Sequence, residues 1–532
     1  MSRTRSRAAV RQLLLRLHFY AGILIAPFLL VAAASGMLYA ASYQVEDVLY
    51  RDLRTVEASG GEPLALAKQV QAVAEAYPEA TVTGVRTGGA DDATQVLLDD
   101  GTVRESGAVP VAFVDPYTGA VLGDSTTYGS SQAGPFREWA ASLHRHLHLG
   151  EPGRVYSELA ASWLWVVALG GIALWLSRRR RPGALMRPRR GGTGRSRSLS
   201  WHAPVGMWLA LVLVFLSVTG VTWSRFAGEH VASLREALSW QTPTLSADAG
   251  EHAAHGDGGG RYHWPSAFDL ALLDDVRDTV AEAGFEGPVE ITLPAGESGE
   301  FLVAETQRSY PVRQDAAVVA TADGEAVIAE QLRFEDWPFM AQATNVLIAA
   351  HMGILFGLAN QLALFAAMAA FTALIVLGYR MWWQRRAKDA VVGRPYPRGS
   401  LRNLPWPAVA AAVPVVALVG WFFPLLGISL VAFLAVDVLI GWRRRPRGSE
   451  RSNQGLSRRT AIGAAPPAAA AAGGAGHVVG EHRGPGEAGE AFHGECQSGV
   501  ETAIQHHALF AAFQAAPGPS SRRRRRRRPR TG

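Results

Sequence analysis

The chain has 532 residues, of which 48% are hydrophobic, and its formal net charge is +6 at pH 7. Its single cysteine, Cys496, excludes an intramolecular disulfide, a zinc–thiolate site and an iron–sulfur cluster. The positive charge gathers in arginine-rich segments beside apolar runs and in the tail, so it does not indicate specific nucleic-acid binding.

Five apolar segments are long enough to span a bilayer, because about 20 helical residues cross the hydrocarbon core. They lie near 17–42, 155–177, 203–224, 344–379 and 404–442. The last is long enough for two spans folded at Phe423-Pro424. We therefore expect about six spans in contact with membrane lipid.

Arginine placement predicts the orientation of these spans. Basic segments precede the first span, join the second to the third and the fourth to the fifth, and follow the sixth. The positive-inside rule then places both termini of this multi-pass membrane protein in the cytoplasm. A cleaved signal peptide is the alternative for the N-terminus. The length of the first apolar run and its recurrence later in the chain favour a retained span.

Two regions between the spans have the pattern of small α+β extracytoplasmic domains. In each, an amphipathic helical stretch is followed by alternating segments typical of antiparallel strands, such as PVAFVDPYTGAVLGD in the first region and DAAVVATADGEAVIAE in the second. A linker rich in glycine, aspartate and histidine precedes the second domain. The final segment is rich in alanine and glycine and ends in seven arginines, a composition typical of disorder.

These patterns give the following boundaries. The first half comprises 1–42 (N-terminus and first span), 43–138 (first extracytoplasmic domain), 139–177 (outer histidine helix and second span) and 178–200 (basic loop). The second half comprises 201–224 (third span), 225–340 (linker and second extracytoplasmic domain), 341–380 (fourth span) and 381–403 (basic loop). A hairpin of the fifth and sixth spans (404–442) and a low-complexity tail (443–532) follow.

Two histidine-bearing frames each occur twice, in the order A-B-A-B. In the A frame, His18 and His202 both begin H-x3-G-x12-[ST]-G-x2-[YW]. In the B frame, His144 and His351 both begin H-x5-G-x20-G-x3-W. The chain is therefore expected to be a tandem-repeat bundle. By predicted depth, His18 with His202 forms the inner pair near the cytoplasmic face, and His144 with His351 forms the outer pair near the opposite face.

Two facing imidazoles on bundle helices provide the axial ligands that a six-coordinate haem requires. A lone histidine at a membrane edge is commonly an interfacial anchor or a helix contact, but four in two aligned pairs favour ligation. His148, four residues after His144, is the substitute candidate for the outer site. A weaker alternative is a metal-collecting group of His230, His252, His255 and His263, for which a solvated linker is the plainer reading.

The blocks RLHFYAGILIAPFLLVAAASGMLY, SLHRHLHLGEPGR, WHAPVGMWLALVLVFLSVTGVTWS, VDPYTGAVLGD and HMGILFGLANQ resemble the PepSY-associated transmembrane helix (PepSY-TM) family of bacterial inner-membrane proteins. The resemblance covers about 10–443 and implies PepSY-like extracytoplasmic domains. The family includes iron-regulated membrane proteins and ferric-siderophore reductases. The resemblance therefore implies that His18, His144, His202 and His351 are ligands of two bis-histidine haem b groups.

The first hypothesis is an oxidoreductase that passes electrons to an extracytoplasmic ferric chelate. The chain contains no nucleotide-binding motif, so the electron donor would be a quinol or a cytoplasmic reductase. No catalytic residue beyond the ligands is assigned. The alternatives are a non-enzymatic protein that binds or restrains an extracytoplasmic partner such as a protease, and a metal-transport accessory that uses the histidine-rich linker.

Overall fold

The computed structural model describes residues 3–58, 60–102, 107–129, 131–177, 187–188, 191–245, 270–294, 299–322, 324–386 and 406–443. Three of the predicted metal-collecting histidines, His252, His255 and His263, lie outside the described residues, as does the tail from 444 onward.

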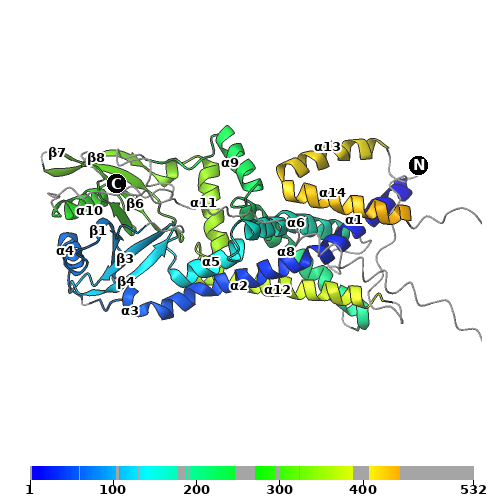
Figure 1. Ribbon diagram of the computed structural model, residues 1–532, viewed down its shortest axis with the longest axis horizontal. Helices are drawn as coiled ribbons and strands as arrows, with labels where there is room; N and C mark the ends of the chain where they lie inside the picture. Colours follow the sequence, from blue (N-terminus) through cyan, green and yellow to red (C-terminus); the bar gives the residue numbers. More distant parts are fainter. Residues whose placement is uncertain are drawn as a thin grey trace, which may run out of the picture. The chain divides into compact units, whose positions relative to one another are not determined.

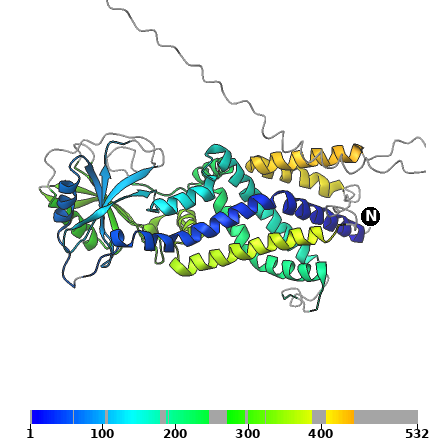
Figure 2. The ribbon, with the colours of Figure 1, turned by 60° about the horizontal axis from the view of Figure 1, so that its bottom comes forward.

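Within the described residues, four helices are long and apolar enough to cross a membrane (Figure 1). They are α2 (Ala26–Leu49), α6 (Glu151–Leu176), α8 (Gly194–Val221) and α12 (Gly357–Trp383). Helix α6 packs against α8, which packs against α12, and α2 runs alongside α12 (Figure 2). Their shared core contains small and large apolar residues, among them Ala33, Leu213 and Phe371. The predicted class, a helical membrane protein, is confirmed.

The first apolar run is divided into two helices by a break at Ile25, between α1 (Arg3–Leu24) and α2. The cause is Pro27, which has no N–H to donate to the carbonyl of Ile23. The hydroxyl of Tyr379 on α12 donates to that carbonyl instead, at 2.9 Å. A side chain from a neighbouring helix thus satisfies the backbone group that the proline leaves without its helical partner.

The predicted span 344–379 consists of two helices, which corrects the expectation of one. Helix α11 (Phe339–Met352) ends at Gly353, whose φ of 83° closes the helix in the left-handed region, and α12 begins at Gly357 with φ of 52°. The first copy has the same form. Helix α5 (Pro135–His146) ends in a left-handed turn, and α6 follows Gly150 with φ of 63°. The glycine of the H-x5-G frame therefore has a conformational role in both copies.

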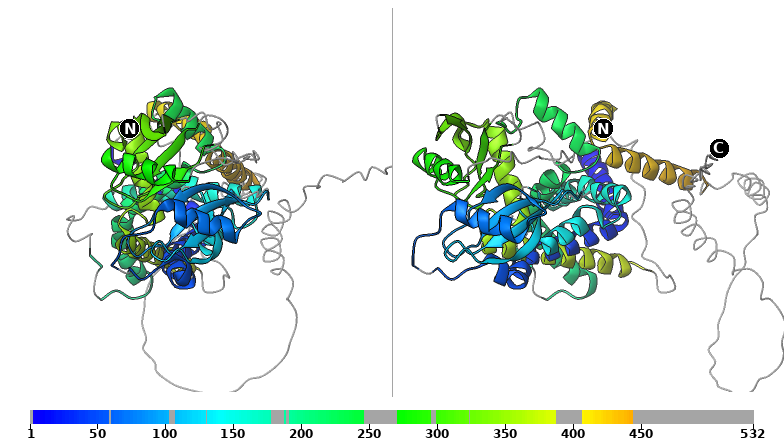
Figure 3. Two further views of the ribbon diagram at one scale, coloured as in Figure 1. Left: turned by 90° about the vertical axis from the view of Figure 1, so that its left-hand side faces the viewer. Right: turned by 60° about the vertical axis from the view of Figure 1, so that its left-hand side comes forward.

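The last apolar segment forms a hairpin of α13 (Trp406–Phe422) and α14 (Pro424–Arg443), and the predicted fold point at Phe423-Pro424 is where the two helices meet (Figure 3). Helix α13 has 17 residues, a length of about 25 Å against a hydrocarbon core of about 30 Å. The count of six spans therefore stays a prediction. Polar side-chain contacts help to attach α14 to the other helices: Arg16 pairs with Asp437 at 2.7 Å, and Trp163 donates to Ser429 at 2.8 Å.

The two regions expected as separate α+β domains contribute four strands each to one continuous antiparallel sheet (Figure 1). The first four are β1 (Thr81–Arg86), β2 (Thr94–Asp99), β3 (Ala108–Val114) and β4 (Val121–Tyr128). The second four are β5 (Val289–Thr292), β6 (Phe301–Glu305), β7 (Ala316–Ala322) and β8 (Glu325–Leu332). The strand order is β4-β3-β2-β1-β5-β6-β7-β8, so the antiparallel β1–β5 pairing joins the two halves.

Two amphipathic helices, α4 (Leu66–Ala76) and α10 (Leu272–Glu282), pack on this sheet and share one apolar core with both sets of strands. The carboxylate of Asp274 on α10 accepts the backbone N–H groups of Leu66 and Ala67 at the start of α4. Across the β1–β5 pairing, Arg86 donates to Glu290 at 2.7 Å. The halves therefore form one structural unit, which we call the sheet domain. The remaining elements are α3 (Arg51–Arg54), α9 (Ala227–Ala237) and a 3-10 turn, Phe334–Asp336.

Candidate functional site: two levels of paired histidines

The structure brings the inner pair together. The rings of His18 on α1 and His202 on α8 lie with centroids 6.3 Å apart and planes at 74°. The Nδ1 atom of His18 lies 3.0 Å from the carbonyl oxygen of Val167 on α6. The Nδ1 atom of His202 lies 3.2 Å from the carbonyl oxygen of Leu374 on α12. Val167 and Leu374 occupy corresponding positions of the B frame, so the two contacts are equivalent.

These contacts define the tautomer of both imidazoles. A carbonyl oxygen only accepts, so Nδ1 of His18 and of His202 carries the proton and Nε2 carries the lone pair. Metal-ligating histidines characteristically donate their second ring N–H to a carbonyl or carboxylate, which orients the ring. The inner pair therefore has the protonation and support of metal ligands.

Glycine leaves room beside His18. A Cβ atom on Gly171 would lie 3.4 Å from Cε1 of His18, and one on Gly170 would lie 3.7 Å from its Nδ1. Gly171 is a residue of the B frame, so this part of the repeated pattern provides space for the ring. The counterpart Gly378 has open space around its Cα, which shows that the two copies differ here.

The outer pair is held by hydroxyl groups of the A frame. Nδ1 of His144 lies 3.0 Å from Oγ of Ser35, and Nδ1 of His351 lies 2.5 Å from Oγ1 of Thr219. Both hydroxyls donate their own proton to a helix carbonyl, Ser35 to Val31 at 2.9 Å and Thr219 to Phe215 at 2.8 Å. With their protons on these carbonyls, the hydroxyls are able to accept from the imidazoles, an arrangement that would leave the lone pair on Nε2 here as well.

The surroundings of the outer pair are apolar and closely packed. A Cβ on Gly36 would lie 3.3 Å from His144, and one on Gly220 would lie 3.8 Å from His351. The ring of Trp223 lies 6.2 Å from that of His351. Helices α5 and α11 are outside the four candidate spans, and burial lowers the pKa of both His144 and His351. A positive charge on His144 would lower the pKa of His351 further.

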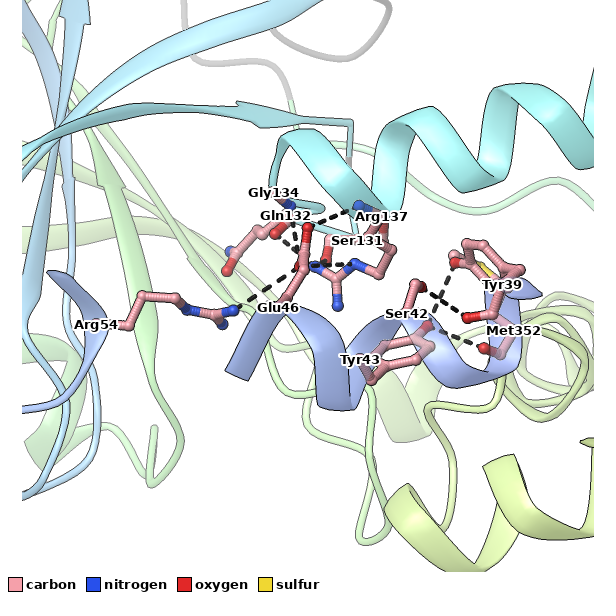
Figure 4. A network of polar contacts seen from close by, with 10 residues as sticks. All are labelled: Tyr39, Ser42, Tyr43, Glu46, Arg54, Ser131, Gln132, Gly134, Arg137 and Met352. Atoms are coloured by element: carbon pink, nitrogen blue, oxygen red, sulfur yellow. Dashed lines mark hydrogen bonds and ion pairs between the residues drawn. The ribbon is translucent and has the colours of Figure 1, made fainter. Parts of the chain in front are cut away.

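A buried carboxylate positions the helix that carries His144 (Figure 4). Glu46 on α2 is 1% exposed and accepts the backbone N–H of Arg137 at 2.8 Å and of Gly134 at 3.3 Å, at the start of α5. The guanidinium groups of Arg137 and Arg54 lie 3.5 and 3.9 Å from it. A carboxylate at a helix N-terminus complements the helix dipole, so α5 is attached to α2 through Glu46 near its start and through Ser35 near its end.

Sequence reasoning missed the role of Glu46. The expected end of the first span at 42 assigned it to the extracytoplasmic region, although the helical pattern of SYQVEDVL continues the span to Leu49. Glu158 on α6 acts similarly on another helix. It is buried, and it accepts the N–H groups of Phe226 and Ala227 at the start of α9.

Two further predicted ligands, His148 and His230, make contacts of their own. His148 does not share a helical face with His144, because α5 ends at His146 and His148 has a φ of 54°. Its ring stacks on Trp139, with centroids 5.5 Å apart. His230 on α9 stacks on Trp421, and its Nδ1 lies 2.9 Å from the carbonyl oxygen of Phe422. Among the described residues, no cluster of three or more His, Cys, Asp or Glu is arranged to hold a bare metal ion.

Four candidate spans, an attached antiparallel sheet domain and histidines paired between helices define a class of polytopic membrane protein. Residues 15–385 match the family model described as the PepSY-associated TM region. The chain therefore belongs to that family, as the histidine-bearing blocks predicted. The matched region ends before α13, so the C-terminal hairpin lies beyond it. A search of curated proteins returned no match.

Proposed function

We propose that this protein is a haem-binding oxidoreductase that moves electrons across the bacterial cytoplasmic membrane to a ferric chelate on the outer side. The observation that carries the proposal is the common arrangement of four histidines. Each has Nδ1 against an oxygen of a neighbouring helix, which leaves the lone pair on Nε2. This donor set fits a bis-histidine haem b at each level, four ligands for two groups.

The recurrence of contacts supports a tandem repeat as the basis of the two sites. In each copy, the A-frame histidine faces the carbonyl of the same B-frame position, and the A-frame hydroxyl faces the B-frame histidine. A repeat of this kind places equivalent residues at equivalent depth about an axis along the membrane normal. The inner and outer pairs are then two levels of one electron route.

The spacing of the levels follows from α8. His202 and Thr219 lie 17 residues apart on this continuous helix, a separation of about 25 Å. The helix core around Ala33, Leu213 and Phe371 is apolar, which would exclude water and ions from the space between the levels. When bound, haem would supply reversible one-electron transfer. The residues of the chain would hold and orient it and insulate the route.

The direction of the route rests on the arginine-rich loops, which place both termini in the cytoplasm. A quinol or a cytoplasmic reductase would donate electrons at the inner pair, and the ferric chelate would accept them beside the outer pair. The sheet domain, on the outer side in this topology, would provide the docking surface. Reduction weakens the chelator's hold on iron, which suits a role in iron acquisition.

The test is a reduced-minus-oxidised visible spectrum of the protein purified in detergent after haem-replete expression. We expect b-type bands in the wild type and loss of part of them in His18→Ala and in His351→Ala. His230→Ala is the matched control, because His230 is a helix-end histidine held by stacking on Trp421. Ferric citrate added to the reduced protein is expected to restore the oxidised spectrum.

Absence of b-type bands from the wild type would refute the electron-transfer proposal. Bands of full intensity in both single variants would refute the ligand assignment while leaving haem binding intact. Bands of the reduced protein that persist after ferric citrate is added would refute a ferric chelate of this kind as the electron acceptor.

A further inference from the structure

Helix α2 extends beyond the repeated frame. The A frame ends at Tyr39, and α2 continues to Leu49, whereas α8 ends before the equivalent Trp223. Polar groups recur along one face of α2 at spacings of four, four and three residues, on Ser35, Tyr39, Tyr43 and Glu46. The first copy therefore extends this face of its span toward the helices of the outer pair.

Tyr43, on this face, contacts the helices of both outer histidines (Figure 4). Its hydroxyl donates at 2.9 Å to the carbonyl of Met352, the neighbour of His351 at the end of α11. The guanidinium of Arg137, in the first turn of α5, lies over its ring at 4.7 Å from the centroid, an attractive contact between a cation and an aromatic face. One side chain therefore joins α11 to α5, which carries His144.

The groups around Tyr43 are themselves held in place. The backbone N–H of Arg137 donates to Glu46 at 2.8 Å, and its guanidinium donates to the carbonyl of Gln132 at 2.7 Å. The hydroxyl of Tyr39 lies 3.3 Å from that of Tyr43, with the two ring planes at 78°. Tyr43 is therefore supported from α5 and from its own helix.

The end of α11 uses this support because the last carbonyls of a helix have no partner within it. The helix ends at Gly353, and the N–H of Ile354 turns back to the carbonyl of Ala349 at 2.9 Å. The carbonyl of Met352 accepts from Tyr43 instead. The backbone beside His351 is thus fixed by a residue of the first copy.

The first copy supports its own histidine helix in another way. The carbonyl of His144 lies 3.4 Å from the hydroxyl of Ser157 on α6. The equivalent position in the second copy is Leu364, which has no hydroxyl. The backbone support of the His351 helix therefore comes from Tyr43, across the bundle, and not from its own copy.

We propose that Tyr43 is a positioning residue of the outer pair, which sets the orientation of the His351 helix relative to the His144 helix. This inference rests on the proposed function, since it concerns the geometry of the same ligands. Groups that orient a ligating imidazole tune the metal that it binds. The angle between two axial imidazole planes sets the g-values of the EPR signal of a low-spin ferric haem, so this signal reports the orientation directly.

The variants are Tyr43→Phe, which removes only the hydroxyl, and Tyr43→Leu, which also removes the ring beside Arg137. Tyr156→Phe is the matched control, because it removes a hydroxyl from a tyrosine of α6 whose ring packs on Phe28 at 4.5 Å. The first measurement is the low-temperature EPR spectrum of each oxidised protein. The outer signal is the one that His144→Ala/His351→Ala lacks. The second is hydrogen exchange at 353–355, which requires no haem.

We expect Tyr43→Phe to shift the g-values of the outer signal and to leave the inner signal unchanged, at full haem content. Tyr43→Leu shifts the outer signal further. Exchange at 353–355 becomes about two- to tenfold faster in Tyr43→Phe, as the loss of one hydrogen bond at the end of a helix predicts. Tyr156→Phe changes neither measurement.

Unchanged g-values of the outer signal in Tyr43→Phe overturn the inference, as does an equal shift in Tyr156→Phe. A wild type without haem refutes the proposed function instead. In that case, or if Tyr43→Phe loses the outer haem altogether, hydrogen exchange decides. Faster exchange confined to the turn after α11 supports the role of Tyr43, and unchanged exchange overturns it.

Discussion

The inner and outer histidine pairs are supported in different ways. Main-chain carbonyls of Val167 and Leu374 accept from the inner pair, which is carried by α1 and α8. Side-chain hydroxyls accept from the outer pair, which is carried by the short helices α5 and α11. No single side-chain substitution removes a carbonyl acceptor, whereas a substitution of Ser35 or Thr219 removes a hydroxyl support. Substitutions of residues other than the four histidines should therefore affect one histidine pair without affecting the other.

The largest effect is expected from Gly153→Ala. A Cβ at Gly153 would lie 1.7 Å from the carbonyl oxygen of His146. This is backbone and cannot rotate away, so the turn between α5 and α6 must open and move His144. We expect loss of the outer haem, measured as loss of one redox wave and a fall in haem content. Gly22→Ala is the control, because a Cβ there meets nothing within 4 Å. An unchanged outer wave in Gly153→Ala would contradict the proposed role of this turn.

An intermediate effect is expected from removing the hydroxyl supports. Ser35→Ala and Thr219→Val each leave one imidazole N–H of the outer pair without its acceptor. Loss of such a support typically reduces metal affinity about 10–100-fold. Haem transfer to an apo-globin measures this as faster loss from the outer site alone. In the control Ser217→Ala, the lost hydroxyl donates to the carbonyl of Ala161 and contacts neither histidine pair among the described residues. Equal loss from both levels would show that the hydroxyls act on overall stability.

The smallest effect is expected from Asp437→Asn, which acts at the inner level. The pair of Asp437 with Arg16 is partly exposed, with side chains 25% and 13% accessible. Such a pair contributes roughly 1 kcal/mol or less. Because Arg16 lies two residues before His18, a slight shift confined to the inner wave is expected in the redox titration. A shift of the outer wave would contradict the separation of the two levels.

The sequence predicted much of the helical part because the physical signal is local. The places of α6 and α8 follow from apolar length, although α8 begins at Gly194 and not near the predicted 203, and the fold point of the hairpin follows from Phe423-Pro424. The repeated frames selected His18 and His202, whose rings the structure brings into contact. The hydroxyl positions were visible in the same frames. Their partnership with His144 and His351 required the fold, because it joins helices far apart in the chain.

The remaining features depend on long-range contacts or on backbone conformation. The break between α11 and α12 falls in the apolar stretch 353–357, where no proline or charged residue marks it, and the positive φ of Gly353 and Gly357 divides the two helices. The β1–β5 pairing joins strands about 200 residues apart, and strand periodicity does not select a distant partner.

The most direct test of the account is the haem content of the purified wild-type protein, measured as pyridine haemochrome per chain alongside His18→Ala/His202→Ala and His144→Ala/His351→Ala. The account predicts two haems in the wild type and one in each double variant, with a different redox wave remaining in each. A wild type that carries no haem, or double variants that retain both, would contradict it.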